Sequence, residues 1–208
     1  MVSRMHASLQ PVELVGWRVR LRPLTGDDYP AWSEVRRRCR EWLVPWEPMP
    51  AGAPPAPEDA ASFAVRCRMR ERERQLGTGY GFGIFVGDRF GGEITLSSIQ
   101  RGPFQQAFIG YWVDQQLAGQ GLVPESVVLV LQFAFEVLSL HRVEIAIVPR
   151  NHASRRVVEK LGVRSEGVAL GYLEIDGVWE DHVRYAMTSE EWQVRRGTLV
   201  GQWLRRPV

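Results

Sequence analysis

The spacing of apolar residues divides the chain into strand and helix signals. Residues 17–23 alternate apolar and arginine positions, and this period of two predicts a half-buried first strand. Thr25 or Asp27 is suited to cap a helix that we expect to run to about Leu43. A second helix is expected over residues 58–76.

Strands dominate the pattern after the second helix. Residues 80–86 and 90–98 predict an antiparallel hairpin, continued by a strand at 108–113. The remaining elements follow in chain order: an apolar helix to Leu140, a strand at 143–148, a helix at 152–161 and a closing hairpin with Asp176-Gly177 at its tip. A helix that connects two strands implies a parallel pair. We therefore expect an α/β (α+β) fold: a mixed, mostly antiparallel twisted sheet with a parallel central pair and helices on both faces.

Length and composition favour one domain. The chain has 208 residues, of which 45% are hydrophobic, enough for one sizeable core. We expect the domain to cover residues 12–192, after a leader at 1–11 and before a helical remnant and tail at 193–208. Residues 45–57 contain six prolines, so we predict a mobile loop there.

The most informative motif connects the strand ending at Val113 to the apolar helix. In Gln116-x-x-Gly119-x-Gly121, two glycines let the loop turn its backbone N–H groups toward an anion at the positive end of that helix. Pro124 suits the first helical turn, where N–H groups have no internal partner. We interpret the loop as a pyrophosphate site, and an ordinary strand-to-helix turn is the alternative.

Two common phosphate-binding motifs do not fit this loop. A dinucleotide fingerprint needs a third small residue where the chain has Pro124. A P-loop needs Gly-Lys-Ser/Thr, and the only lysine in the chain is Lys160. The loop therefore suits a different pyrophosphate, and coenzyme A is the candidate.

Further motifs occur around the loop in a fixed order. They are Trp46-Glu47-Pro48, Arg101-Gly102-x-Phe104, His141-Arg142-Val143, Asn151-His152-Ala153-Ser154, Glu159-Lys160-Leu161-Gly162 and Tyr172-Leu173-x-Ile175-Asp176-Gly177-x-Trp179-x-Asp181-His182. With the loop they resemble the acetyl-coenzyme A core of the GCN5-related N-acetyltransferases (GNAT). Within that superfamily the chain is most similar to the Rim-type enzymes that acetylate the N-terminal alanine of ribosomal proteins, and to the RimJ branch in particular. The resemblance covers roughly residues 12–192.

The resemblance implies that acetyl-CoA is a cosubstrate and that a protein α-amine attacks it directly in a ternary complex. It implies that pantetheine pairs with the backbone of the strand at Trp112 and Val113, while Arg155 or Arg156 lies near the phosphates. The implied coenzyme contacts are Trp112, Val113, Gln116, Ala118, Gly119, Gln120, Gly121, Leu122, Asn151, Ser154, Arg155 and Arg156.

Acetyl transfer to an amine requires a neutral nucleophile. A free α-amine titrates near ~7.7–8.0, so it demands less of a general base than lysine does. Glu144 is the candidate base, with Glu93 and Asp181 as rivals, and a solvated strand residue is the alternative reading of Glu144. Related alanine acetyltransferases carry an acid two positions later, where this chain has Ala146.

The reaction also needs a proton for the departing thiolate and a stabilised oxyanion. Ser154 is the candidate donor toward the sulfur, and support of a helix cap is its alternative role. A backbone N–H near Val113 is the candidate oxyanion donor. We expect structural roles for His141 and His182.

Aromatic residues are candidates for the acceptor site. Trp46, Tyr172 and Trp179, together with Trp42, are suited to line a groove for the first residues of a peptide, with core packing as the alternative. The arginines of 66–74 suit a solvated helix face, and a contact with ribosomal RNA or with an acidic protein tail is the alternative. The net charge of +2 argues against a strong field for nucleic acid.

The remaining features exclude several classes of protein. Cys39 and Cys67 are too few for a disulfide framework and show no metal-ligand spacing, so we expect reduced thiols and no metal. The longest apolar run, at 127–140, is too short for a membrane span of ~20 residues. With no signal-peptide pattern, we expect a cytoplasmic protein, either a monomer or a homodimer.

Three functions therefore follow from the sequence. The leading one is acetylation of a protein N-terminus, an alanine of a ribosomal protein. The second is acetylation of a small-molecule amine. The third is a coenzyme A-binding ribosome-assembly factor or sensor with weak turnover, which the missing carboxylate at Ala146 keeps open.

Overall fold

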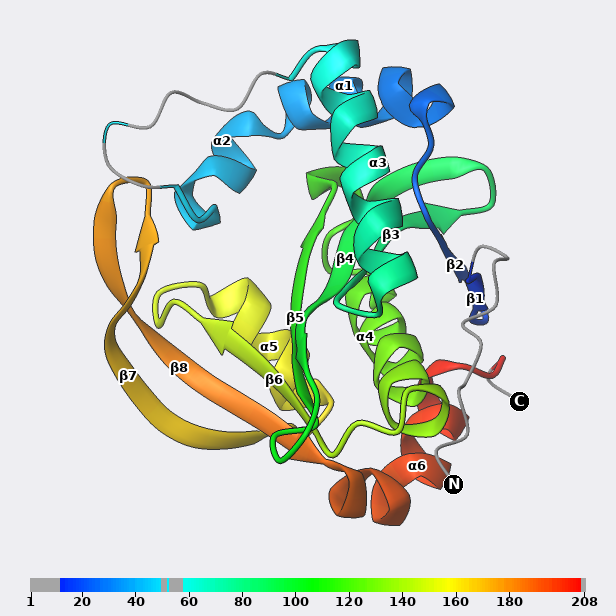
Figure 1. Ribbon diagram of the computed structural model, residues 1–208, viewed down its shortest axis with the longest axis vertical. Coiled ribbons are helices and arrows are strands. Elements are labelled where there is room, and N and C mark those ends of the chain that lie inside the picture. Colours follow the sequence, from blue (N-terminus) through cyan, green and yellow to red (C-terminus); the bar gives the residue numbers. More distant parts are fainter. Residues whose placement is uncertain (1–11, 50–51, 53–57, 207–208) are drawn as a thin grey trace.

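The computed structural model describes residues 12–49, 52 and 58–206 and is built on one eight-stranded sheet, with strand order β1-β2-β3-β4-β5-β6-β8-β7 (Figure 1). The strands are β1 (Leu14–Val15), β2 (Val19–Arg22), β3 (Tyr80–Val86), β4 (Arg89–Gln100), β5 (Gln106–Val113), β6 (Arg142–Ile147), β7 (Arg164–Ile175) and β8 (Val178–Thr188). Neighbouring strands are antiparallel except β5 and β6, which are parallel. The expected mixed sheet is confirmed.

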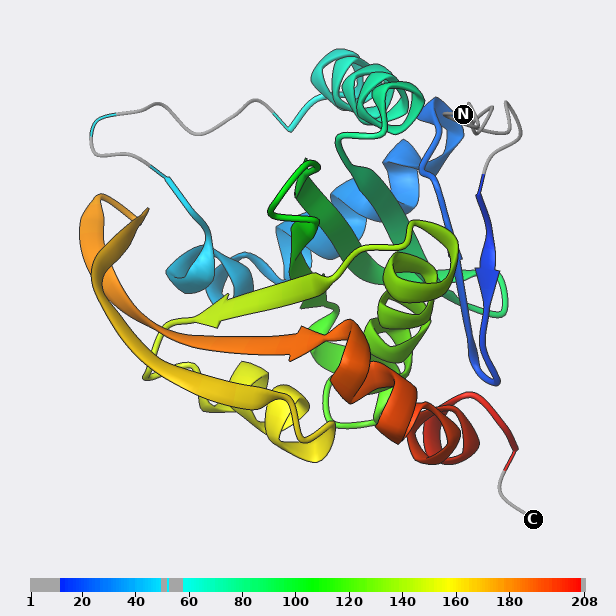
Figure 2. The ribbon, with the colours of Figure 1, turned by 60° about the horizontal axis from the view of Figure 1, so that its bottom comes forward.

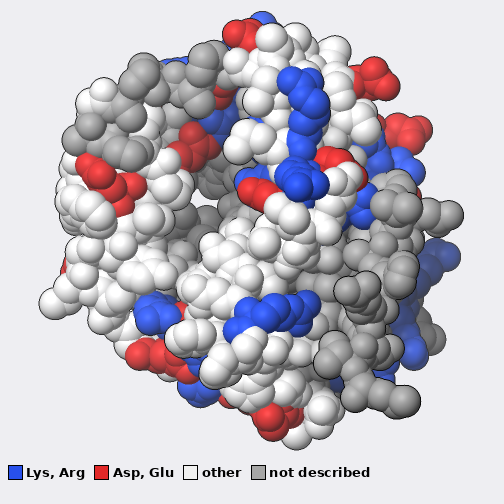
Figure 3. Space-filling view, in the orientation of Figure 1, with Lys and Arg blue, Asp and Glu red and all other residues white. Residues whose placement is uncertain are grey.

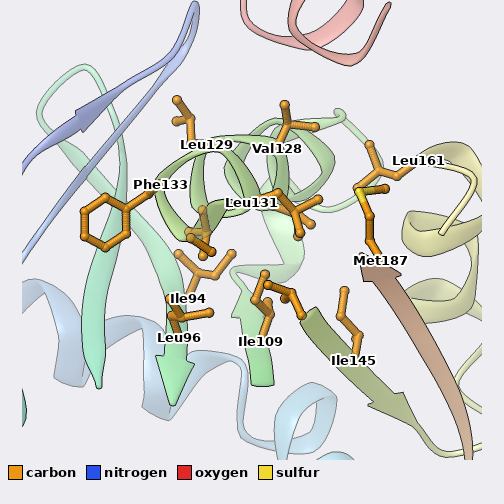
Figure 4. Close-up of a cluster of buried hydrophobic side chains, with 14 of the residues drawn as sticks. Ile94, Leu96, Ile109, Val128, Leu129, Leu131, Phe133, Ile145, Leu161 and Met187 are labelled. Carbon is orange, nitrogen blue, oxygen red and sulfur yellow. The ribbon is translucent and has the colours of Figure 1, made fainter. Parts of the chain in front are cut away.

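Helices cover both faces of this sheet (Figures 1 and 2). They are η1 (Gly26–Asp28), α1 (Tyr29–Arg38), α2 (Arg40–Leu43), η2 (Val44–Trp46), α3 (Ala60–Leu76), η3 (Gln115–Leu117), α4 (Leu122–Gln132), η4 (Phe133–Val137), α5 (His152–Lys160) and α6 (Ser189–Trp203). Because side chains alternate between faces, Ile84 packs in the main core with α4 and α5, and its neighbour Phe85 packs with α1–α3. Figure 4 shows the main core, where Ile109 of β5 faces Leu131 of α4.

The parallel pair at the centre of the sheet is short. It consists of Gln106↔Arg142, Ala107↔Val143 and Phe108↔Glu144. Beyond these positions β5 stays paired with β4 as far as Val113, and β6 stays paired with β8 as far as Ile147. The two strands diverge from their common start (Figure 1), so a gap opens in the middle of the sheet.

Most predicted elements form close to their expected bounds, including the turn at Asp176-Gly177. The helix expected to reach Leu43 is broken at Cys39 into α1 and α2. The helix expected to reach Leu140 ends at Val137, after a π-helical turn. In the described part of the chain no helix is long and apolar enough to cross a membrane.

The proline-rich segment is attached to the closing hairpin at its start. Pro48 forms a bridge with Ile175 of β7. The N–H of Met49 donates to the carbonyl of Glu174 (3.1 Å), and the N–H of Gly177 donates to the carbonyl of Met49 (2.9 Å). The mobility predicted for the rest of this segment falls mainly on residues outside the described part.

Residues 193–203 form the second part of α6, which ends at Trp203, so the helical remnant expected after Trp192 belongs to this helix. The hydroxyl of Thr188 caps this helix by accepting the N–H of Glu191. Leu199 is 2% exposed and belongs to the main core. α6 is therefore part of the folded domain.

A substitution of Leu199 tests this assignment. Leu199→Ala should lower the free energy of unfolding by about 2–5 kcal/mol, because it leaves a cavity in the core. Val194→Ala on the same helix, where the side chain is 85% exposed, should change it by less than about 0.5 kcal/mol. Urea unfolding measures both, and equal small effects would show that α6 does not contribute to the domain.

Candidate active site

The edge of β5 that faces the gap carries free backbone groups. The N–H of Asp114 donates to the carbonyl of Gly91 (2.8 Å), so the backbone groups of Trp112 also point to β4, because these directions alternate along a strand. The backbone groups of Tyr111 and Val113 point the other way, into the gap. The backbone groups of Trp112, where the contact was expected, are therefore turned away from the gap, and those of Tyr111 face it.

The loop after η3 presents a row of N–H groups at the start of α4. Gly119 and Gly121 have φ values of 78° and 81°, in the left-handed region that glycine adopts at little cost. Among the described residues, the N–H groups of 119–123 find no acceptor within the chain, as is usual for the first turn of a helix. They stand at the positive end of the α4 dipole. This arrangement suits a bound anion.

Asp114 ties this loop to the rest of the protein. Its buried carboxylate accepts hydrogen bonds from Arg38 (2.8 and 3.0 Å), from Arg89 (2.8 Å) and from the N–H of Gln116 (2.9 Å). Burial opposes its ionisation, but these donors outweigh burial and hold the pKa of Asp114 far below its usual range. The residue joins α1, β4 and the loop, and the sequence pattern alone did not single it out.

Ser154 and Tyr111 come together between α5 and β5. Asn151 caps α5, since its side-chain oxygen accepts the N–H of Ser154 (3.0 Å). The hydroxyl oxygens of Ser154 and Tyr111 lie 2.8 Å apart, and burial raises the pKa of Tyr111 above its usual range. The sequence analysis missed Tyr111, although its alternation with Ile109 and Val113 places it on the face that the connecting helix must cover.

Two arginines and a histidine expected near the site differ in their surroundings. Arg155 donates to the hydroxyl of Tyr185 (3.3 Å) and so turns toward β8, whereas Arg156 is exposed. His182 is buried, with Nδ1 3.0 Å from the carbonyl of Glu180, in a structural setting. Both arginines keep surface that a ligand can reach, since the side chain of Arg155 is 35% exposed and Arg156 is exposed.

Glu144 lies where β5 and β6 separate, and it is not a solvated strand residue. It is 3% exposed, and its carboxylate accepts hydrogen bonds from Arg142 (2.8 Å) and Arg184. Protonation of this carboxylate would remove the counter-charge of Arg184 and one of the two carboxylates paired with Arg142, whose other partner is Glu166. The alternative reading as a solvated residue is therefore wrong, and the role of base meets an electrostatic obstacle.

The rival carboxylates are engaged as well. Glu93 is buried and accepts hydrogen bonds from the indole of Trp32 (2.7 Å) and from Arg66. Asp181 accepts the N–H of Gly171 (2.8 Å). Each of the three candidate carboxylates thus already has a donor within the chain.

The elements that carry the predicted aromatic residues border a hollow in the surface. Figure 3 shows this hollow beside β5, between α2 and the β7–β8 hairpin. Trp46 ends η2 on one side and Tyr172 belongs to β7 on the other, while Trp179 is 65% exposed at the hairpin tip. The indole of Trp42 donates to the carbonyl of Val113 (3.2 Å), which leaves the N–H of Val113 as the free group.

The described residues contain no group of three or more His, Cys, Asp or Glu side chains that could hold a metal ion. Cys39 and Cys67 are both free thiols.

Removal of the Asp114 charge should destabilise the fold in a pH-dependent way. Asp114→Asn is expected to cost about 1–3 kcal/mol at neutral pH, because it unpairs guanidinium groups that solvent only partly screens. Since the pKa of Asp114 is lowered in the folded state, its contribution is complete above the unfolded value of about 3.9 and is lost as pH falls toward the folded pKa. Urea unfolding from about pH 7 to about pH 2 should show wild type and variant converging in acid. A constant difference would contradict this account.

Comparison with known proteins relates this geometry to a family. Residues 18–164 match the Acetyltransferase (GNAT) domain. The probable N-acetyltransferase YjcK of Bacillus subtilis is 49% identical over 104 residues, which are 50% of this chain and 58% of that protein. The ribosomal protein uS5-alanine N-acetyltransferase of Escherichia coli is 34% identical over 101 residues, 49% of this chain and 52% of that protein. The chain thus spans little more than half the length of these curated relatives.

Solved structures match over a greater length. Mycobacterium smegmatis RimJ in complex with CoA-disulfide has a TM-score of 0.84 and 31% identity, over 94% of this chain and 95% of that one. The ribosomal-protein-S5-alanine acetyltransferase of Vibrio fischeri has a TM-score of 0.78 and 27% identity, over 87% and 98% of the two chains. The family match over residues 18–164 shows that the chain belongs to the GNAT acetyltransferase family.

Proposed function

We propose that this chain is an acetyl-CoA-dependent N-acetyltransferase that modifies the α-amine of a protein N-terminus. The observation that carries the proposal is the gap between β5 and β6, which joins an anion site at the start of α4 to a free strand edge. The similarity to uS5-alanine N-acetyltransferase and to RimJ supports an alanine of a ribosomal protein as the acceptor.

Coenzyme A fits the polar groups of this gap. The N–H groups of 119–123 suit its diphosphate, and those of Tyr111 and Val113 suit the amides of an extended pantetheine arm. Arg156 is available to the phosphates from α5. When bound, acetyl-CoA supplies an acetyl group activated as a thioester. The M. smegmatis relative was solved with CoA-disulfide, in agreement with this fit.

The engaged carboxylates favour an α-amine over a lysine as the acceptor. Glu144, Glu93 and Asp181 each accept hydrogen bonds inside the chain, so a strong dedicated base is not evident among the described residues. An α-amine with a pKa near ~7.7–8.0 is already partly neutral at physiological pH, whereas lysine near ~10.4 is not. The acceptor itself thus meets most of the requirement for deprotonation.

The hydroxyls of Ser154 and Tyr111 and the free edge of β5 are proposed to meet the other two requirements of the reaction, a proton for the thiolate and stabilisation of the oxyanion. The N–H of Val113 faces the gap and can donate to the oxygen that gains negative charge during acyl transfer. We propose that Ser154 protonates the departing thiolate and regains a proton, through solvent, from the amine that has been acetylated. The hydroxyl of Tyr111, 2.8 Å from that of Ser154, would hold Ser154 in position. Trp46 and Tyr172, from the two sides of the hollow, are proposed to contact the first residues of the peptide, with Trp179 further out.

An acetylation assay tests the acceptor directly. The enzyme should acetylate peptides that begin with alanine, and kcat/KM should rise with pH up to about 8 as the α-amine loses its proton. The same peptide blocked at its N-terminus but carrying a lysine is the control and should not react. Preferential turnover of a small amine such as spermidine, or thioester binding without turnover, would contradict the proposal.

Substitution of the hydroxyl pair tests the proton donor. Ser154→Ala should lower kcat by roughly 10²-fold with little change in KM for acetyl-CoA. Tyr111→Phe should lower kcat less, because it removes only the group that positions Ser154. Glu144→Gln should lower the melting temperature but leave the pH profile of kcat unchanged. If Ser154→Ala retains full kcat, the assignment of the donor is wrong.

A further inference from the structure

Arg18, just before β2, holds the back of the anion-binding loop. Its guanidinium donates to the carbonyl of Gln120 (2.7 Å) through one terminal nitrogen and to the carbonyl of Gly121 (3.2 Å) through the other. Nε of the same group donates to the carboxylate of Glu125 (2.9 Å) in the first turn of α4. One side chain thus connects the first strands, the loop and the helix.

The contacts of Arg18 fix the direction in which the loop presents its N–H groups. The described residues contain no cis peptide bond, and in a trans peptide the N–H points opposite to the carbonyl of the preceding residue. With the carbonyls of Gln120 and Gly121 turned toward Arg18, the N–H groups of Gly121 and Leu122 must point away from it. These two groups belong to the row that faces the anion site.

Glu125 makes this arrangement rigid. It is 0% exposed, and its carboxylate also accepts the N–H groups of Arg18 (2.6 Å) and Val19 (3.1 Å). Three donors from one short segment therefore hold the carboxylate, and the carboxylate balances the charge of the guanidinium. Arg18 cannot swing toward a ligand without unpairing a fully buried charge.

Gly121 is the position where the close fit is most demanding. A Cβ atom there would lie 3.3 Å from a terminal nitrogen of Arg18 and 3.4 Å from the ring of Trp203 in α6. Its φ of 81° also favours glycine. The loop is thus packed from behind by Arg18 and α6, and its open side is the one that carries the N–H groups.

We propose that Arg18 is a positioning residue for the diphosphate of coenzyme A, acting through the carbonyls of the loop without touching the ligand. The inference rests on the proposed use of coenzyme A, but not on the identity of the acceptor. If Arg18 were merely structural, its substitution would lower the affinity for all ligands equally. If Arg18 positions the loop, its substitution lowers the affinity only for ligands that carry the diphosphate.

Arg18→Lys is the informative variant, because one ammonium group keeps the charge opposite Glu125 but cannot reach both carbonyls as the planar fork does. Arg20→Lys is the matched control: Arg20 lies two residues further on, 40% exposed, and its nearest acidic groups are Glu13 at 3.8 Å and Asp88 at 3.9 Å. Thermal unfolding verifies that both variants are folded.

Dissociation constants are then measured for three probes by titration calorimetry or ligand-observed NMR. Arg18→Lys should weaken the binding of coenzyme A and dephospho-coenzyme A at least tenfold, since the loop N–H groups would no longer point at the charged diphosphate. Pantetheine, which lacks the diphosphate, should bind both forms equally, and Arg20→Lys should bind all three probes like wild type. If Arg18→Lys fails to fold, Glu125→Gln serves instead and should show the same selective loss.

Two results would overturn the inference: unchanged binding of coenzyme A to Arg18→Lys, or an equal loss for pantetheine and coenzyme A. Failure of the proposed function is a separate result. A wild-type protein that binds coenzyme A but does not acetylate peptides would refute the acceptor assignment alone. A wild-type protein that does not bind coenzyme A would refute both.

Discussion

The site depends on the early separation of two parallel strands. β5 and β6 are paired at three positions, after which β4 retains one strand and β8 retains the other. Backbone N–H groups along the free edge of β5 need a partner, since unpaired polar groups are costly once water is excluded. The gap is therefore a ready position for an extended ligand that carries amides.

The loop at the end of the gap is held from two sides by arginine and carboxylate pairs. On one side, Asp114 forms ion pairs with Arg38 and Arg89 and fixes the start of the loop. On the other, Glu125 fixes Arg18 against the carbonyls near the start of α4. In both pairs the carboxylate is fully buried and the arginine partly exposed. Directed hydrogen bonds thus orient the loop and its N–H groups before any ligand is bound.

Features that depend on neighbouring residues could be predicted from the sequence, and features that depend on distant ones could not. The Asp176-Gly177 turn and the glycine loop follow from local backbone chemistry, and both form as expected. The burial of Glu144 depends on Arg184, which is 40 positions away and reaches it through strand pairing. The contact of Tyr111 with Ser154 likewise requires the crossover between β5 and α5. The full length of α6 could not be predicted, because few of its residues, such as Leu199, are buried.

The central claim is that the loop and the free edge of β5 bind one ligand together. Backbone amide NMR of the labelled protein during titration with coenzyme A measures this most directly. The account predicts that the largest chemical-shift changes occur at the N–H groups of residues 119–123 and at those of Tyr111 and Val113. Shifts confined to α3 or to the outer edge of β7, with these amides unchanged, would contradict it.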